Sequence, residues 1–139
     1  MSARRVLAVA VSALACTFAG CGGVISADLF IVERSGPGAR PPLSVLVSEE
    51  GVVRCDRGAP VRLSDPMLIE ARTLQEELHG PATRHLSLPS RPGSVFGYRV
   101  RDGEGSVSFA DNSSGLPKVL ERLQLFTLKV AQSVCHLPV

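Results

Sequence analysis

Apolar and polar residues alternate in several short segments of the chain, a pattern typical of strands with one buried face. Residues 29–32 form a short apolar run, and Leu43, Val45 and Val47 then alternate with their neighbours. A Glu-Glu-Gly turn leads into a further strand segment, residues 52–55. Because the glycine of this turn tolerates a positive φ, the two segments predict a hairpin.

A second hairpin is predicted around the Asp-Gly pair at positions 102–103. Asp-Gly between alternating apolar residues is a strong hairpin signal. The alternating apolar positions lie on both sides of the turn: Phe96, Tyr98 and Val100 before it, Val107 and Phe109 after it.

Helical spacing replaces the alternation in two longer segments. Asp65 as a cap and Pro66 as the first helical residue predict the start of one helix, and Gly80-Pro81 predicts its end. Its apolar stripe is formed by Met67, Ala71, Leu74 and Leu78. The second helix follows Leu116-Pro117, and its stripe is formed by Val119, Leu120, Leu123, Phe126, Thr127, Val130 and Val134.

The order of these elements predicts an α+β fold. We expect an antiparallel sheet built from two hairpins and an N-terminal strand, with two amphipathic helices packed on one face. A chain of 139 residues has room for one such domain.

The start of the chain follows a different pattern. Arg4 and Arg5 precede a long apolar run, and small residues follow it. This layout is typical of a secretory signal peptide. The segment Phe18-Ala19-Gly20-Cys21 resembles a bacterial lipobox, in which the cysteine sulfur receives a diacylglycerol and becomes the new N-terminus after cleavage.

The lipobox implies a signal peptide over residues 1–20, a lipidated tether over 21–27 and a single domain over 28–139. Its acyl chains, palmitate among them, would hold the protein on the extracytoplasmic face of the cell membrane. Ordinary cleavage after Ala15 or Ala27, lipidation of Cys16 and an uncleaved anchor remain alternatives.

Charge gives little information about partners. Of the 15 basic residues, Arg4 and Arg5 lie within residues 1–20, so the exported chain carries 13 basic and 13 acidic residues. This balance argues against a nucleic-acid binder and leaves the acyl chains as the expected membrane attachment.

Two cysteines remain in the expected domain, Cys55 and Cys135. An even pair in an exported chain indicates a disulfide, and it would require Cα atoms within about 7 Å. Closing so long a loop contributes about 4 to 5 kcal/mol in the chain-entropy model. A metal site using both thiols and His136 is the alternative, although the spacing is unlike that of a zinc finger.

Candidate catalytic groups are sparse. Asp111, Ser113 and Ser114 form a polar cluster that His85 would have to join from another loop. Turns and helix caps also require Asp and Ser before a helix, so this cluster is explained without catalysis. No motif for a nucleophilic serine, a phosphate-binding loop or a paired-histidine metal site occurs. We therefore expect no enzyme and no cofactor.

Arg99 and Arg101 are the candidate partner-binding residues. Two residues apart on one strand, they present guanidinium groups on the same face of the sheet. Such groups bind carboxylates in bidentate geometry, although a solvated sheet face explains them as well.

The combined elements resemble a family of lipoproteins of unestablished activity from high-GC Gram-positive (actinobacterial) bacteria. The resemblance covers most of the exported chain and transfers no catalytic residue. It is carried by Asp28-Leu29-Phe30, Val53-Arg54-Cys55, Ala71-Arg72, Ser108-Phe109-Ala110-Asp111, Phe126-Thr127 and Cys135.

A looser similarity links the chain to emfourin-type inhibitors of thermolysin-like metalloproteases. It is carried by Arg34-Ser35-Gly36, Leu63-Ser64-Asp65, Leu88-Pro89, Tyr98, Asp111 and Pro117. The lipid anchor, Cys55 and Cys135 depart from that family.

The sequence thus predicts a non-enzymatic, membrane-tethered lipoprotein that binds a protein partner. The alternatives are an inhibitor of a secreted protease that presents the loop at residues 35–42 or another exposed loop, and a small hydrolase using Asp111, Ser114 and His85. Neither the partner nor the oligomeric state follows from the sequence.

Overall fold

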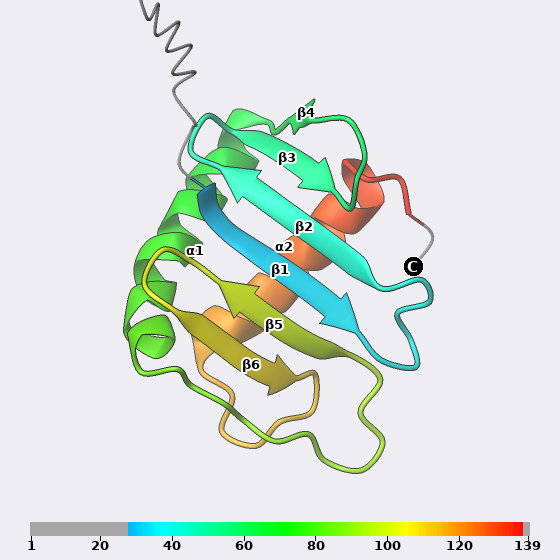
Figure 1. Cartoon of the computed structure of the whole chain (residues 1–139), viewed down its shortest axis with the longest axis vertical. Coiled ribbons are helices and arrows are strands. Elements are labelled where there is room, and N and C mark those ends of the chain that lie inside the picture. Colours follow the sequence, from blue (N-terminus) through cyan, green and yellow to red (C-terminus); the bar gives the residue numbers. More distant parts are fainter. Residues whose placement is uncertain (1–27, 138–139) are drawn as a thin grey trace, which may run out of the picture.

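The computed structural model describes residues 28–137 and contains one antiparallel sheet of six strands with two helices. The strands are β1 (Asp28–Ser35), β2 (Leu43–Ser48), β3 (Val52–Cys55), β4 (Val61–Arg62), β5 (Gly97–Arg101) and β6 (Ser106–Ala110), and the helices are α1 (Asp65–Thr83) and α2 (Lys118–Ser133). The strand order is β4-β3-β2-β1-β5-β6, which places β1 between the two hairpins. Both helices lie behind the sheet in Figure 1. The predicted α+β fold is therefore confirmed.

The core lies between the sheet and the helices. On every strand except β4, alternate residues are buried there because a strand directs successive side chains to opposite faces. In β2, Leu43, Val45 and Val47 are buried, as their alternation predicted. Tyr98 lies opposite Phe109 in the second hairpin, and their rings stack 5.0 Å apart. From α2, Phe126 contacts the Phe30 ring edge-on at 6.0 Å.

Helix α1 begins at Asp65, which the sequence predicted as the N-cap residue just before the helix. Ser64 has the extended backbone of an N-cap residue, and Asp65 is already helical. Asp65 instead places a carboxylate in the first turn, where its negative charge interacts favourably with the positive end of the helix dipole. Pro66 follows in the first turn, as helix starts tolerate.

The prediction that Gly80-Pro81 ends α1 is wrong, because the helix continues to Thr83. Pro81 removes one helical hydrogen bond, but Ala82 beyond it is buried against the core. The backbone N–H of Leu86 donates to the carbonyl of Pro81, which closes the helix end. Burial of Ala82 and the bond from Leu86 thus offset part of the cost of the proline, which in a helix interior is about 3 kcal/mol.

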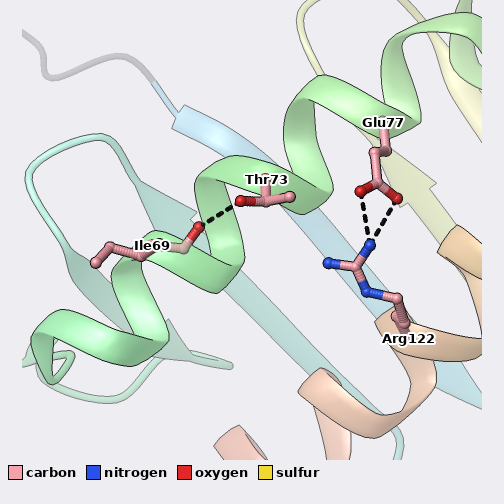
Figure 2. Close-up of polar contacts among 4 residues, drawn as sticks. All are labelled: Ile69, Thr73, Glu77 and Arg122. Carbon is pink, nitrogen blue, oxygen red and sulfur yellow. Dashed lines mark hydrogen bonds and ion pairs between the residues drawn. The ribbon is translucent and has the colours of Figure 1, made fainter.

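The two helices are joined across their exposed sides. Figure 2 shows the Arg122 guanidinium of α2 facing the Glu77 carboxylate of α1, with N–O distances of 2.6 and 2.8 Å. One turn before Glu77, the Thr73 hydroxyl donates to the carbonyl of Ile69, its own i−4 neighbour. Exposed pairs of this kind contribute about 0 to 1 kcal/mol, so the buried stripes hold the helices together.

Both sheet edges are short or covered. β4 has only two residues and pairs with Val52 and Val53, and it was not predicted. At the other edge, residues 86–88 run beside β6: the N–H of Leu88 donates to the carbonyl of Ser108, and the N–H of Ser108 donates to the carbonyl of Leu86. These pairings protect the edges, which would otherwise bind other strands.

Candidate binding surface

Neither helix of residues 28–137 covers the second face of the sheet, which faces the viewer in Figure 1. We call it the open face. Three aliphatic side chains lie near its middle: Ile31 of β1, Leu46 of β2, which is paired with Ile31, and Val52 of β3. All three are half-buried. This face therefore combines a short apolar strip with solvent exposure.

Four exposed arginines surround the apolar strip. Arg54 pairs with Leu46 across β2 and β3, and Arg62 pairs with Val52 across β3 and β4. Arg99 and Arg101 project from β5, and their buried neighbour Val100 confirms that both lie on the predicted common face. The arginines thus flank the apolar strip on both sides.

Only one of these arginines is paired with a carboxylate within residues 28–137. Glu33 lies opposite Arg99 in register, but its carboxylate contacts the Arg101 guanidinium at 2.9 Å. Within residues 28–137, Arg54, Arg62 and Arg99 take part in no ion pair. Their charges are therefore available to groups outside the domain.

A hollow of about 590 Å³ lies on the open face beside Arg99. Its lining includes Glu33, Arg99, Leu88, Gly97 and Ala110. Gly97 and Ala110 pair across β5 and β6, and because both residues are small, a depression forms between their larger neighbours. A Cβ added at Gly97 would meet Ser35 only at ordinary contact distance, so a larger side chain can be introduced there.

Polar contacts fix the loop beside this hollow. The Asp111 carboxylate accepts hydrogen bonds from the Ser94 hydroxyl at 2.7 Å and from the backbone N–H of Val95. Burial alone would raise the pKa of the Asp111 carboxyl, but the bonds from Ser94 and from backbone N–H groups hold this pKa below its ordinary value. Asp111 is therefore an anchor for residues 94–96.

The predicted hydrolase residues are not joined by hydrogen bonds within the described chain. Asp111 is engaged with Ser94, while Ser114 and His85 are exposed. Ser113 is buried; its hydroxyl accepts from the N–H of Ala110 and donates to the carbonyl of Pro89. The cluster thus serves the turn-forming role that its composition also allowed.

Cys55 and Cys135 form the predicted disulfide, with Cα atoms 5.8 Å apart. It joins the end of β3 to the segment after α2. Because both sulfurs are bonded to each other, the alternative metal site at Cys55, Cys135 and His136 is wrong. Within residues 28–137, no group of three His, Cys, Asp or Glu side chains is placed to hold a metal ion.

The predicted lipidation site, Cys21, the tether 21–27 and the alternative Cys16 lie outside the described residues. Among the helices of residues 28–137, neither is long and apolar enough to cross a bilayer.

Fold and surface together define an α+β two-layer domain with one helix-covered and one open sheet face. Comparison with protein-family models, curated proteins and solved structures finds no match for this chain. The resemblances to actinobacterial lipoproteins and to emfourin-type inhibitors remain predictions.

Sequence reasoning missed the aliphatic strip, Arg54, Arg62 and the hollow at Gly97. Two signals were present: Leu46 has the opposite parity to its buried neighbours, and glycine inside a strand often marks a close approach.

Proposed function

We propose that this domain is an extracytoplasmic binding module whose open face binds an acidic segment of a partner protein. The observation that carries the proposal is the apolar strip bordered by Arg54, Arg62, Arg99 and Arg101. Arginine-rich surfaces bind carboxylates well because the planar guanidinium presents paired donors, and aliphatic contacts add affinity.

Charge favours an acidic partner over a second copy of this chain. Two open faces in contact would place arginines of like charge close together, which is unfavourable. Four carboxylates line the hollows of the open face: Asp28, Glu33, Glu50 and Asp102. Glu33 is engaged with Arg101, and Asp102 accepts bonds from the N–H groups of Glu104 and Gly105. Asp28 and Glu50 are left against the three arginines that are unpaired within residues 28–137, Arg54, Arg62 and Arg99. An extended segment that alternates acidic and aliphatic residues complements both the charges and the strip.

The test uses a short fluorescein-labelled peptide of alternating Glu and Val, with a Lys-Val peptide as its charge-reversed counterpart. Fluorescence anisotropy should show binding of the acidic peptide, weakened by added salt, and none of the basic one. Arg99→Glu combined with Arg101→Glu should weaken binding at least about tenfold.

The matched control is Arg84→Glu combined with Lys118→Glu, which changes the net charge equally but at the ends of the helices. It should bind like the wild type. Equal loss in both double variants, or no binding of the acidic peptide, would overturn the proposal, and dimers in sedimentation that dissociate in the Arg99/Arg101 variant would replace it with self-association.

We further propose that the module is held on the outer face of the membrane through acyl chains on Cys21. The Cys55–Cys135 disulfide supports export, because such bonds persist mainly outside the reducing cytoplasm. The intact mass of protein purified from native membranes should include a diacylglycerol on residue 21 that Cys21→Ala removes. A lipid-free mass that fits cleavage after Ala15 or Ala27 would contradict the anchor.

One observation favours protease inhibition as a second function. The loop at residues 36–42 is fixed by a bond from the N–H of Gly38 to the carbonyl of Val95 at 3.1 Å, and inhibitory loops bind well when they are held in place. Gly38 packs so closely against Val95 and Phe96 that a side chain there would displace them. Thermolysin should be inhibited by the wild type and less by Gly38→Asp; an unaffected protease would eliminate this function.

A further inference from the structure

Arg34 is a buried charge within the covered face of the sheet. It follows Phe30 and Val32 at alternate positions of β1, so its side chain enters the same layer as theirs. Only 7% of Arg34 is exposed. Its guanidinium carbon lies 4.9 Å from the centre of the Phe96 ring.

The neighbours of Arg34 satisfy this charge only in part. Within residues 28–137, it takes part in no ion pair, and its shielded Nε has no hydrogen-bond partner. The Phe96 ring attracts the cation through its π face. Arg34 also interacts with the hydroxyl of its cross-strand partner Tyr98, where it opposes the rise in the pKa of Tyr98 that burial causes. Neither neighbour carries a negative charge. A buried guanidinium is strongly stabilised by a negative group beside it.

A small cavity of about 40 Å³ adjoins Arg34. Its lining includes Arg34, Arg40, Ala39, Pro41, Leu43 and Leu137, with no carboxylate among the lining residues. A space of this volume exceeds what one water molecule needs and is too small for a nucleotide or a sugar. Two cationic side chains and carbon-rich walls suit a small, weakly hydrated monovalent anion.

We propose that this cavity is a binding site for a small monovalent anion of the size of chloride or formate, held by Arg34. Such an ion would neutralise the buried charge and connect β1 to the loop at residues 36–42. Independently of the open face, anion binding would then stabilise the folded domain, because a ligand that binds only the native state raises its stability.

The test is thermal unfolding in sodium chloride, sodium formate or sodium gluconate at equal ionic strength. Gluconate is too large for the cavity and controls for screening. Chloride should raise the Tm saturably by about 4 to 8 °C relative to gluconate. A response to formate alone would identify a carboxylate site, and a response to chloride a halide site.

Arg34→Met should abolish the response to these anions, whereas Arg84→Met, which removes an exposed arginine at the end of α1, should retain it. Ala39→Val, which narrows the cavity and keeps the arginine, should also weaken the response; it serves if Arg34→Met does not fold. Crystals grown in sodium bromide should show an anomalous peak beside Arg34. Equal Tm values in all three salts, or a crystal with only water beside Arg34, would overturn the site.

Discussion

The two faces of the sheet are built from the same strands but differ in almost every physical property. On the covered face, Val47, Val53 and Val107 have no measurable exposure, and they belong to one core with the buried residues of both helices. On the open face, Ile31 and Leu46 are half-buried among exposed arginines. Alternation with a period of two therefore lets one strand bury one set of side chains in the core and expose the other set, which carries the proposed binding surface.

The largest expected effect comes from removing a side chain on the covered side. Phe126→Ala should lower the free energy of unfolding by about 3 to 5 kcal/mol, because it leaves a cavity against Phe30. Urea denaturation measures the loss. Leu46→Ala on the open face is the matched control and should lose about 1 kcal/mol or less. Equal losses would show that the two faces do not differ as described.

The bridge between the sheet and the end of α2 is expected to have the next largest effect. Replacing Cys55 and Cys135 together by serine should lower the free energy of unfolding by about 2 to 4 kcal/mol, since the unfolded chain loses its covalent loop. This is less than the chain-entropy model gives, because residual structure in the unfolded chain reduces the entropy that the bridge removes. Guanidinium denaturation of the variant and of the reduced wild type should agree. An unchanged midpoint in both would contradict a stabilising bridge.

A smaller loss is expected where polar contacts fix the edge of the open face. Asp111→Asn should lower stability by about 1 to 3 kcal/mol, because the carboxylate accepts bonds from Ser94 and Val95. The pKa of Asp111 is lowered by folding, so its stabilising effect is complete above its ordinary pKa of 3.8 and is lost as pH falls below that value. The difference between wild type and variant, measured by urea denaturation, should therefore shrink below about pH 4. A constant difference down to pH 2 would disagree with this.

The smallest effect on stability is expected from the arginines themselves. Arg99→Ala and Arg101→Ala should each change the free energy of unfolding by less than about 0.5 kcal/mol, even though Arg101 contacts Glu33, because exposed ion pairs contribute little. Urea denaturation checks this value beside the peptide-binding assay. A large loss of stability would assign these residues a structural role instead.

The elements of the fold followed from local patterns, but their arrangement did not. Alternation of apolar and polar residues identified the strands, and helical spacing identified the apolar stripes of both helices. Each pattern arises because one side of the strand or helix is buried. The position of β1 between the hairpins depends on pairings distant in sequence, which no local pattern encodes. β4 was missed because two residues are too few to show a period.

The candidate surface was predictable only where charged residues alternate with apolar ones along a strand and so show which side chains face solvent. Arg99 and Arg101 were placed on the correct face because Val100 lies between them, but their role in binding stays a prediction. Arg34 shares the parity of Phe30 and Val32, so its burial was readable, although arginine on a strand is usually exposed. Neither the hollow at Gly97 nor the cavity beside Arg34 could be predicted, since each is formed by segments distant in sequence.

The Cys55–Cys135 bridge also determines how the domain withstands proteolytic cleavage. Its cysteines are 80 positions apart, and the exposed loops at residues 56–60 and 89–92 lie between them. A single cut in either loop yields two fragments that stay covalently joined and separate only when the bridge is reduced. After such a cut, the fragment that carries Arg99 and Arg101 would therefore stay attached to the N-terminal part of the chain.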